Sequence, residues 1–234
     1  LTGEIRRRLN IEKMGHLGTL DPMARGVLPL AINEATKALP FLEDGAKTYL
    51  AEIEFGKSST TYDRTGEITE SKGHFLPPCD ASPLEEALSS FRGKISQIPP
   101  RFSAIHVGGK RAYDLARKGE AFELEPRCVT IFQLDLIQYQ YPRAILRVTR
   151  SKGTYIRSLV HDLGQKLEAG AILTALTRLA SGPFRIEEAV AFESIDIGFQ
   201  KHCRRLTQVF GDLPSLNVNL TEKRNLLASG TLPV

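Results

Sequence analysis

The sequence predicts an α+β fold, in which a mixed, largely antiparallel central sheet is flanked by helices and loops. Residues 47–55, 128–139 and 144–149 alternate apolar and polar side chains, which is the period of half-buried strands. Residues 154–167 carry an apolar stripe at helical spacing and predict the longest helix. Strands and helices follow one another without the regular strand–helix–strand order of a parallel sheet, which favours antiparallel pairing.

Shorter elements are expected in the first third of the chain. Residues 2–9 suit a short basic helix, and the apolar run over 27–32 predicts a buried strand. Residues 34–42 suit a helix. The segment 56–66 is rich in Ser, Thr, Asp and Gly, which favour turns, so it predicts a turn-rich link after the strand 47–55.

The middle of the chain predicts alternating short helices and strands. We expect a helix over 82–91 with Ser82 as its N-cap, because Ser followed by Pro is typical of a helix start. We also expect a strand over 102–107 that ends in a Gly-Gly turn, a helix over 111–118, and a strand over 172–179.

Length and composition indicate one large domain with a small appendage. The chain has 234 residues, of which 41% are hydrophobic and 25% charged, so a sizeable core is expected and bulk disorder is not. Leu213-Pro214 is expected to separate a domain over residues 1–212 from a short C-terminal appendage over residues 213–234. Because the chain begins without Met, we expect that an upstream piece is missing.

Charge and cysteine content narrow the class of partner and the compartment. The formal net charge of +4 mildly favours a polyanionic partner. Clusters of Lys and Arg interleaved with tyrosines favour RNA or DNA over a membrane, and no apolar run approaches the roughly 18–20 residues of a membrane span. The three cysteines are far apart and lack zinc-site spacing, so we expect reduced thiols in the cytoplasm.

The most informative segment is the glycine-rich stretch over residues 15–26, which contains Asp21 followed by Pro22. Asp-Pro is typical of a helix start with Asp as the N-cap, and the alternative is a reactive carboxylate. The chain has no phosphate-binding loop, dinucleotide fingerprint, nucleophile elbow or zinc-binding His pair. What remains is a set of ionisable residues that needs no cofactor: His16, Asp21, Tyr49, Tyr155 and Arg157.

An ordered set of motifs over nearly the whole chain resembles the bacterial tRNA pseudouridine-55 synthase family. The matching segments are 15–29, 34–37, 47–49, 56–66, 100–104, 109–113, 116–119, 151–159 and 176–184. The resemblance implies a pseudouridine synthase-like fold. The chain departs from the family in lacking its usual opening strand, in having a short C-terminal part, and in carrying Met23 where Leu is common.

The resemblance implies that a uridine in the TΨC arm of tRNA, at position 55, is isomerised to pseudouridine. The base leaves C1′ through N1, rotates while it is held, and reattaches through C5. This reaction is redox-neutral, so neither a cofactor nor a metal is expected. The expected partner is the tRNA stem-loop, with no membrane and no obligate protein partner, and the protein is expected to be a cytoplasmic monomer.

The resemblance assigns the chemistry to three residues. Asp21 matches the catalytic aspartate, which attacks the sugar or the base or helps to remove a sugar proton, and the sequence leaves these routes open. Arg157 matches its arginine partner, since an adjacent cation favours an ionised carboxylate and aims its oxygens. Tyr49 matches the tyrosine that stacks on the target base, and its hydroxyl is a candidate for removing the C5 proton.

Further residues are assigned to substrate binding. Tyr155 and Leu176 match positions that line the uracil pocket. His16 matches a residue that enters the RNA fold when the target nucleotide is flipped out. Four basic side chains are expected to contact phosphates rather than to read bases: Arg101, Lys110, Arg111 and Lys152.

Two other functions remain open. One is a non-catalytic RNA-binding or RNA-folding protein on the same scaffold, although binding alone requires none of Asp21, Tyr49 and Arg157. The other is a guide-RNA-dependent pseudouridine synthase, which relies on partner proteins and a larger C-terminal module. A nuclease is not favoured, because the acidic cluster that would bind a pair of metal ions is absent.

Overall fold

A computed structural model describes residues 2–71, 80–214 and 218–229. Contacts divide the chain into two compact units, Leu1–Ile197 and Gly198–Val234. The predicted boundary between residues 212 and 213 concerns an RNA-binding appendage and stays a prediction. No helix within the described ranges is long and apolar enough to cross a membrane.

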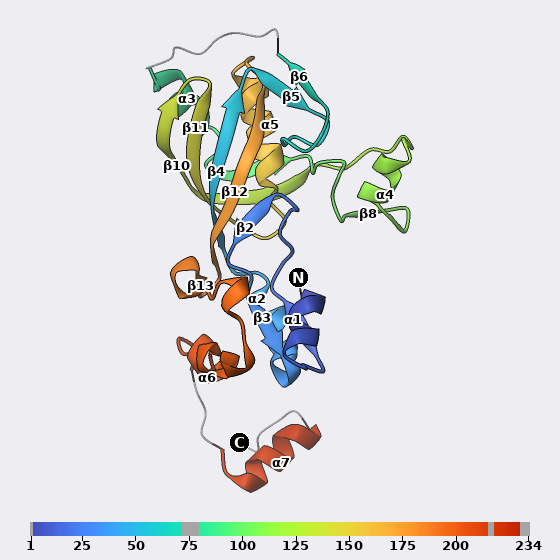
Figure 1. The fold of residues 1–234 in the computed structure, drawn as a ribbon, viewed down its shortest axis with the longest axis vertical. Coiled ribbons are helices and arrows are strands. Elements are labelled where there is room, and N and C mark those ends of the chain that lie inside the picture. The colour runs from blue at the N-terminus through green and yellow to red at the C-terminus, as the bar shows by residue number, and fades with distance from the viewer. Residues whose placement is uncertain (1, 72–79, 215–217, 230–234) are drawn as a thin grey trace. The chain divides into compact units, whose positions relative to one another are not determined.

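The first unit is built around a seven-stranded sheet with the order β13-β12-β4-β11-β10-β7, in which β2 also pairs with β12 (Figure 1). Among the named strands of this sheet in the described residues, only β2 and β12 pair in parallel. The α+β class with a largely antiparallel sheet is therefore confirmed. The strands are β2 (Ala24–Gly26), β4 (Lys47–Phe55), β7 (Gly93–Gln97), β10 (Arg127–Gln140), β11 (Arg143–Arg150), β12 (Ala171–Ser181) and β13 (Phe184–Arg185).

The strands with regular alternation lie where the sequence predicts them. The strand β4 has the predicted bounds, and its first, third, fifth, seventh and ninth side chains are buried. The strands β10 and β11 form an antiparallel pair, and β12 extends the predicted strand at both ends. Alternation is reliable here because one face of the sheet is covered.

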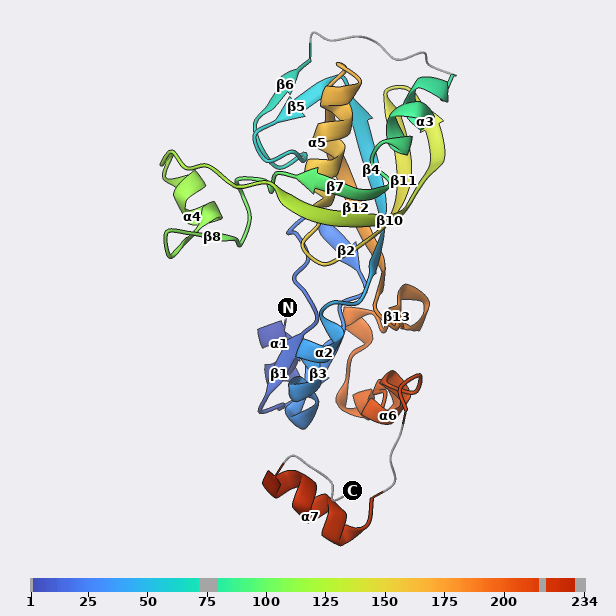
Figure 2. The same ribbon diagram turned by 180° about the vertical axis from the view of Figure 1, so that it is seen from behind.

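Two helices cover that face. The helix α5 (Ile156–Lys166) turns its apolar stripe towards the sheet, and α3 (Ser82–Ser89) packs beside it (Figure 2). The helix α3 begins at the predicted residue, but Ser82 is not its N-cap. The Asp80 Oδ1 atom accepts the Ser82 N–H at 2.9 Å, so the capping oxygen comes from two residues earlier.

The N-terminal elements are shorter than predicted. The helix α1 (Thr2–Arg8) is followed by β1 (Met14–His16), which pairs antiparallel with β3 (Leu30–Ile32). The prediction of a buried strand over 27–32 is wrong, because β3 covers only three half-buried residues. The predicted helix over 34–42 divides into a 3-10 helix (Asn33–Ala38) and α2 (Leu39–Leu42), since Pro40 lacks the N–H needed to continue one helix.

A hairpin and a helix project from the sheet between β7 and β10 (Figures 1 and 2). The strands β8 (His106–Val107) and β9 (Lys110–Arg111) are joined by two glycines of positive φ, and α4 (Ala112–Arg117) follows. The predicted strand over 102–107 forms only at its end. The carbonyls of residues 102, 103 and 105 are instead hydrogen-bonded to Arg157, Tyr113 and Ala112.

The remaining elements are short. The turn-rich link predicted over 56–66 contains β5 (Lys57–Ser59), which pairs with β6 (Ile68–Glu70). Two 3-10 helices follow β13, Ile186–Glu188 and Phe192–Ser194. A third 3-10 helix, Ile197–His202, leads into the second unit, which contains α6 (Leu206–Val209) and α7 (Leu220–Ser229).

Packing of α5 against the start of β12 requires Gly164. A Cβ atom there would overlap the backbone nitrogen of Ala171 and lie 2.6 Å from the carbonyl carbon of Gly170. We expect Gly164→Ala to lower the free energy of unfolding by about 1–3 kcal/mol, measured by urea denaturation. Gly3→Ala is the matched control, because Gly3 is also helical and has no atom within 4 Å of such a Cβ. The control should be neutral or stabilising by up to about 1 kcal/mol, and equal losses in both variants would contradict the packing argument.

Candidate active site

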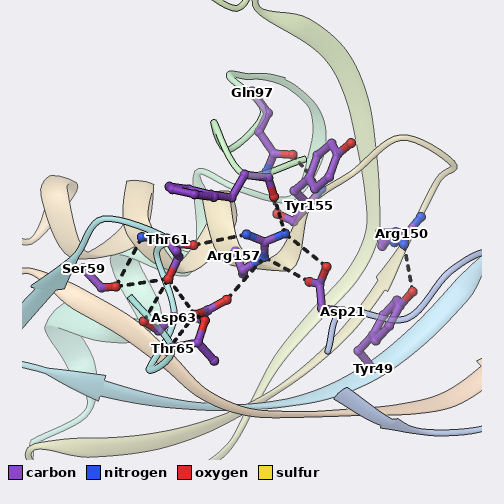
Figure 3. A network of polar contacts seen from close by, with 11 residues as sticks. Asp21, Tyr49, Ser59, Thr61, Asp63, Thr65, Gln97, Arg150, Tyr155 and Arg157 are labelled. Atoms are coloured by element: carbon purple, nitrogen blue, oxygen red, sulfur yellow. Dashed lines mark hydrogen bonds and ion pairs between the residues drawn. The ribbon is translucent and has the colours of Figure 1, made fainter. Parts of the chain in front are cut away.

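The centre of the site is a two-point ion pair between Arg157 and Asp21 (Figure 3). The Arg157 Nε atom donates to Asp21 Oδ2 at 3.0 Å, and Nη2 donates to Asp21 Oδ1 at 3.1 Å. The Arg157 side chain is 6% exposed and the Asp21 side chain is 31% exposed. The first turn of α5 thus holds a buried guanidinium behind a carboxylate that remains partly open to solvent.

Arg157 uses its other donors on two further segments. The Nη1 atom donates to the Thr61 carbonyl at 3.2 Å, and Nη2 donates to the Phe102 carbonyl at 3.1 Å. A second carboxylate, Asp63, lies with Oδ2 at 3.6 Å from Nε. These partners come from far apart in the sequence, so they fix the plane of the guanidinium and with it the orientation of the Asp21 oxygens.

Asp63 belongs to this polar network and was missed by the sequence reasoning. Its side chain is 6% exposed. The Oδ1 atom accepts hydrogen bonds from the Thr61 hydroxyl at 2.7 Å, the Thr65 N–H at 2.9 Å and the Thr65 hydroxyl at 2.5 Å. The Thr-x-Asp-x-Thr pattern over residues 61–65 is typical of an Asx turn, and this pattern could have indicated from the sequence that the Asp63 side chain is hydrogen-bonded.

The segment around Asp21 is a turn that leads into a strand. The Ala24 N–H donates to the Asp21 carbonyl at 2.9 Å, and Ala24 begins β2, where it pairs with Leu176 of β12. The interpretation of Asp21 as a helix N-cap is therefore wrong, since no helix follows Pro22. Pairing with β12 extends the backbone at the point where a helix would have begun.

A second buried arginine, Arg178 of β12, closes this loop at both ends. Its Nε donates to the Val27 carbonyl at 2.8 Å, while Nη1 and Nη2 lie 3.4 and 3.3 Å from the Gly18 carbonyl. Arg178 is 0% exposed. Gly26 faces its backbone with φ of +105°, and a Cβ there would overlap the Arg178 carbonyl. Sequence reasoning missed Arg178, although an arginine within an apolar strand was a visible signal.

Tyr49 and Leu176 lie on neighbouring strands of the same sheet. The Tyr49 hydroxyl accepts a hydrogen bond from Arg150 Nη2 at 2.8 Å, and the Arg150 guanidinium carbon lies 5.1 Å from the ring centroid. Leu176 pairs with Ala51, two residues along β4 from Tyr49. Tyr49 is only 3% exposed, so contact between its ring and a base requires neighbouring groups to move.

Tyr155 precedes α5 and is held through its main chain. Its N–H donates to Gln97 Oε1 at 2.8 Å, and Gln97 Nε2 donates to its carbonyl at 3.1 Å. Burial raises the pKa of the Tyr155 hydroxyl above its ordinary value, and the nearby Asp21 carboxylate adds to the rise, while Arg157 opposes it. The Tyr155 hydroxyl is thus held in its protonated, neutral form.

The remaining predicted residues lie on other elements. His16 is exposed on β1. Arg101 is exposed, donates to the Glu120 carbonyl at 3.1 Å and lies over the Phe122 ring. Within the described part of the chain, no hydrogen bond or ion pair joins either of them to the Asp21–Arg157 pair.

The other basic side chains predicted to contact phosphates are also exposed. Lys110 and Arg111 help to line a cavity of about 480 Å³ formed by the hairpin and α4. Lys152 instead pairs with Glu43 at 2.7 Å and with Asp44 at 3.2 Å. A phosphate at Lys152 would therefore compete with two carboxylates.

The comparison with family models identifies the family of this chain. The model described as TruB family pseudouridylate synthase (N terminal domain) matches residues 6–156. The chain belongs to this family. The predicted resemblance is therefore confirmed, and the TruB match extends from α1 to the start of α5, so it includes both Asp21 and Tyr49.

Curated relatives carry the name tRNA pseudouridine synthase B. The protein from Clostridium kluyveri is 44% identical over 193 residues, which are 82% of this chain and 66% of the relative. That from Syntrophomonas wolfei subsp. wolfei is 48% identical over 187 residues, 78% of this chain and 62% of the relative. That from Francisella philomiragia is 42% identical over 225 residues, 94% and 74% of the two chains. The chain thus spans less than two thirds of the length of the first two of these TruB relatives.

Solved structures with the same fold include a chain of a Cbf5-Nop10-Gar1 complex. It aligns with a TM-score of 0.68 and 27% identity, over 91% of this chain and 57% of that chain. A chain from an H/ACA RNP bound to a substrate RNA containing 2′-deoxyuridine aligns with a TM-score of 0.59 and 26% identity, over 82% of this chain and 46% of that chain. Both support the α+β fold class assigned from the strand order.

A stacked ring pair lies beside the turn that carries Asp63. Tyr62, with φ of 63°, stacks on His161 of α5 with ring centroids 3.9 Å apart and an interplanar angle of 11°. Burial lowers the pKa of His161 and raises that of Tyr62. Burial also raises the pKa of the next residue, Asp162, to about 6. The turn is therefore packed on a half-buried part of α5.

We predict that Asp63→Asn destabilises the site. An amide retains one oxygen for the Thr61 and Thr65 donors, but its NH₂ group then faces Arg157, so a buried charge loses part of its compensation. The free energy of unfolding should fall by about 2–3 kcal/mol, measured by urea denaturation. Asp135→Asn is the control, since Asp135 on β10 contacts Gln133 in an exposed pair, and it should change little. A fully stable Asp63→Asn protein would contradict the assigned role.

A second prediction concerns pH and Asp162. Because its pKa is about 6 in the folded protein and 3.8 is its ordinary value, the folded state binds the proton more tightly, and stability falls as pH rises through this range. Asp162→Asn should therefore raise the melting temperature at pH 8 and leave it nearly unchanged at pH 4. The gain is at most about 1 kcal/mol, allowing for partial exposure. A gain at pH 4 equal to that at pH 8 would refute the assignment.

Proposed function

We propose that the protein isomerises a uridine in the TΨC loop of tRNA, at position 55, to pseudouridine, with Asp21 as the catalytic residue. The observation that carries this proposal is the partly exposed Asp21 carboxylate, held at two points by the buried guanidinium of Arg157. Such an arrangement supplies an aimed carboxylate without placing the cation in the path of a ligand. The names of the curated relatives support the same reaction class.

The geometry around Asp21 supports an approach of the uridine from one side of the carboxylate. Arg157 engages both Asp21 oxygens from the buried side, so the ligand approaches from the exposed side. There the carboxylate attacks the sugar or the base, or assists removal of a sugar proton, and each route conserves the atoms of the nucleotide. In this proposal Tyr155 and Leu176 line the uracil pocket, and Tyr49 stacks on the base once the groups that bury its ring have moved. A base within a folded tRNA reaches such a site only after it is flipped out.

The RNA-binding surface follows from the exposed basic side chains. Arg101, Lys110 and Arg111 lie on or beside the projecting hairpin, where they would contact phosphates without reading bases. His16, exposed on β1, would occupy space left by the flipped nucleotide. We further propose that the protein acts in the cytoplasm as a monomer without a cofactor or an obligate protein partner.

Two alternative functions are less well supported. A purely RNA-binding protein has no need for an aspartate clamped by a buried arginine beside Asp63. A guide-RNA-dependent enzyme agrees with the structural likeness to Cbf5, but at 26–27% identity. The relatives named tRNA pseudouridine synthase B are 40–48% identical. The higher identity favours tRNA as the direct substrate.

We predict that Asp21→Asn abolishes product formation while RNA binding is retained. The amide preserves the shape of the side chain but lacks the nucleophilic and basic charge, so tritium release from an unmodified transcript with 5-tritiated uridine should fall by at least about 1,000-fold. The dissociation constant for the transcript should stay within about threefold. Asp135→Asn serves as the control, because Asp135 is a half-buried carboxylate on β10 that contacts Gln133 instead of Arg157.

Three outcomes would contradict the proposal. Release at the wild-type rate from Asp21→Asn would exclude the assigned chemistry. Release by the wild type only with an added guide RNA would indicate the second alternative. Mapping the modified nucleotide to a position outside the TΨC loop would refute the assigned substrate site.

A further inference from the structure

Three cationic side chains surround the phenol of Tyr49 on the inner face of the sheet. Lys47 lies two residues earlier on β4 and so points to the same face. Arg178 is directly opposite Tyr49 on β12, and Arg150 pairs with Lys47 from β11. The strands on both sides of Tyr49 therefore each contribute an arginine.

Two of these cations, Lys47 and Arg178, donate their hydrogen bonds to backbone carbonyls and not to Tyr49. The Lys47 Nζ atom donates to the carbonyls of Glu43 at 3.0 Å and Gly45 at 3.4 Å. The guanidinium of Arg178 is used on the carbonyls that close the Asp21 loop. Burial, followed by the charges of Arg150, Arg178 and Lys152, lowers the pKa of Lys47 to about 8, with Glu43 opposing the change. The neighbourhood of Tyr49 is thus rich in positive charge.

Arg150 alone of the three has a hydrogen bond to the Tyr49 hydroxyl in the described structure. Its Nη2 donates to the phenol oxygen at 2.8 Å (Figure 3). Its Nη1 donates to the Ser151 carbonyl at 3.0 Å. Among the described residues, no carboxylate lies within ion-pair distance of Arg150. Its polar contacts therefore join the segment that leads into α5 to the Tyr49 hydroxyl.

We propose that Arg150 is a positioning residue that orients the Tyr49 hydroxyl for the isomerisation. A guanidinium only donates hydrogen bonds, so the phenol oxygen accepts and its own proton must point away from Arg150. The phenol is then held in one orientation before a ligand arrives. Arg150 need not touch the base, since it acts through Tyr49. This inference rests on the proposed function and deepens it.

The test measures kcat and KM for tritium release from the tRNA transcript in two backgrounds, the wild type and Tyr49→Phe. Phenylalanine keeps the ring and removes only the hydroxyl, so we expect it to lower kcat. Arg150→Met should lower kcat about tenfold in the wild type, with KM within about twofold. In the Tyr49→Phe background it should cause no further loss, because the group that it orients is absent. Arg150→Lys, which keeps a charged donor, should retain kcat within about threefold.

Arg143→Met is the matched control, because Arg143 lies on the same strand and is exposed. It should leave kcat and KM unchanged in both backgrounds. Melting temperatures of all variants show whether a loss arises from unfolding.

Other outcomes of these measurements would contradict the positioning role of Arg150. Equal losses from Arg150→Met in both backgrounds, or a rise in KM alone, would assign Arg150 to folding or RNA binding. A fully active Tyr49→Phe enzyme would show that the hydroxyl needs no positioning. A wild-type protein without activity would overturn the proposed function as well, whereas the other outcomes leave that function in place.

Discussion

The guanidinium of Arg157 is the constraint on which the site depends. Burying a cation is costly unless it is paired and hydrogen-bonded, and this one has a bidentate carboxylate, a second carboxylate and two backbone carbonyls as partners. Its partners lie in the loop before β2, the turn after β5 and the segment after β7. Since buried ion pairs contribute little net stability, the value of this one is geometric: it brings three distant segments to one point.

The parts of the fold that were predicted are those in which one face of an element is buried along its whole length. The strand β4 and the helix α5 follow from periodicity, because each packs on the core. Predictions failed where tertiary hydrogen bonds override local preference. Pro22 suits a helix start, but the residues that follow it form β2, which pairs with β12. The carbonyl of Phe102 accepts a hydrogen bond from Arg157 instead of pairing within a strand.

The site residues were predicted from motifs, and the pairing of Asp21 with Arg157 is the part that the structure brings together. Asp21 and Arg157 are in recognisable motifs, whereas Asp63, Arg150 and Arg178 contact partners that only the folded chain brings near. Their signal in the sequence was indirect: a charged residue at a position that the sheet buries needs a compensating partner. A charged residue at a buried position therefore indicates that a polar network exists, but it does not indicate which other residues belong to that network.

The inner face of β4 explains why the site forms at this end of the sheet. Phe55, Ile53 and Ala51 belong to the apolar core, while Tyr49 and Lys47 follow towards the start of the strand. This face of β4 therefore changes from apolar to cationic within one strand. Tyr49 lies at the boundary, where its ring packs in the apolar core and its hydroxyl is hydrogen-bonded to Arg150. The cations beyond it are compensated largely by backbone carbonyls, not by carboxylates. Asp21 thus brings its negative charge to a region already rich in positive charge, next to the point where the apolar core ends.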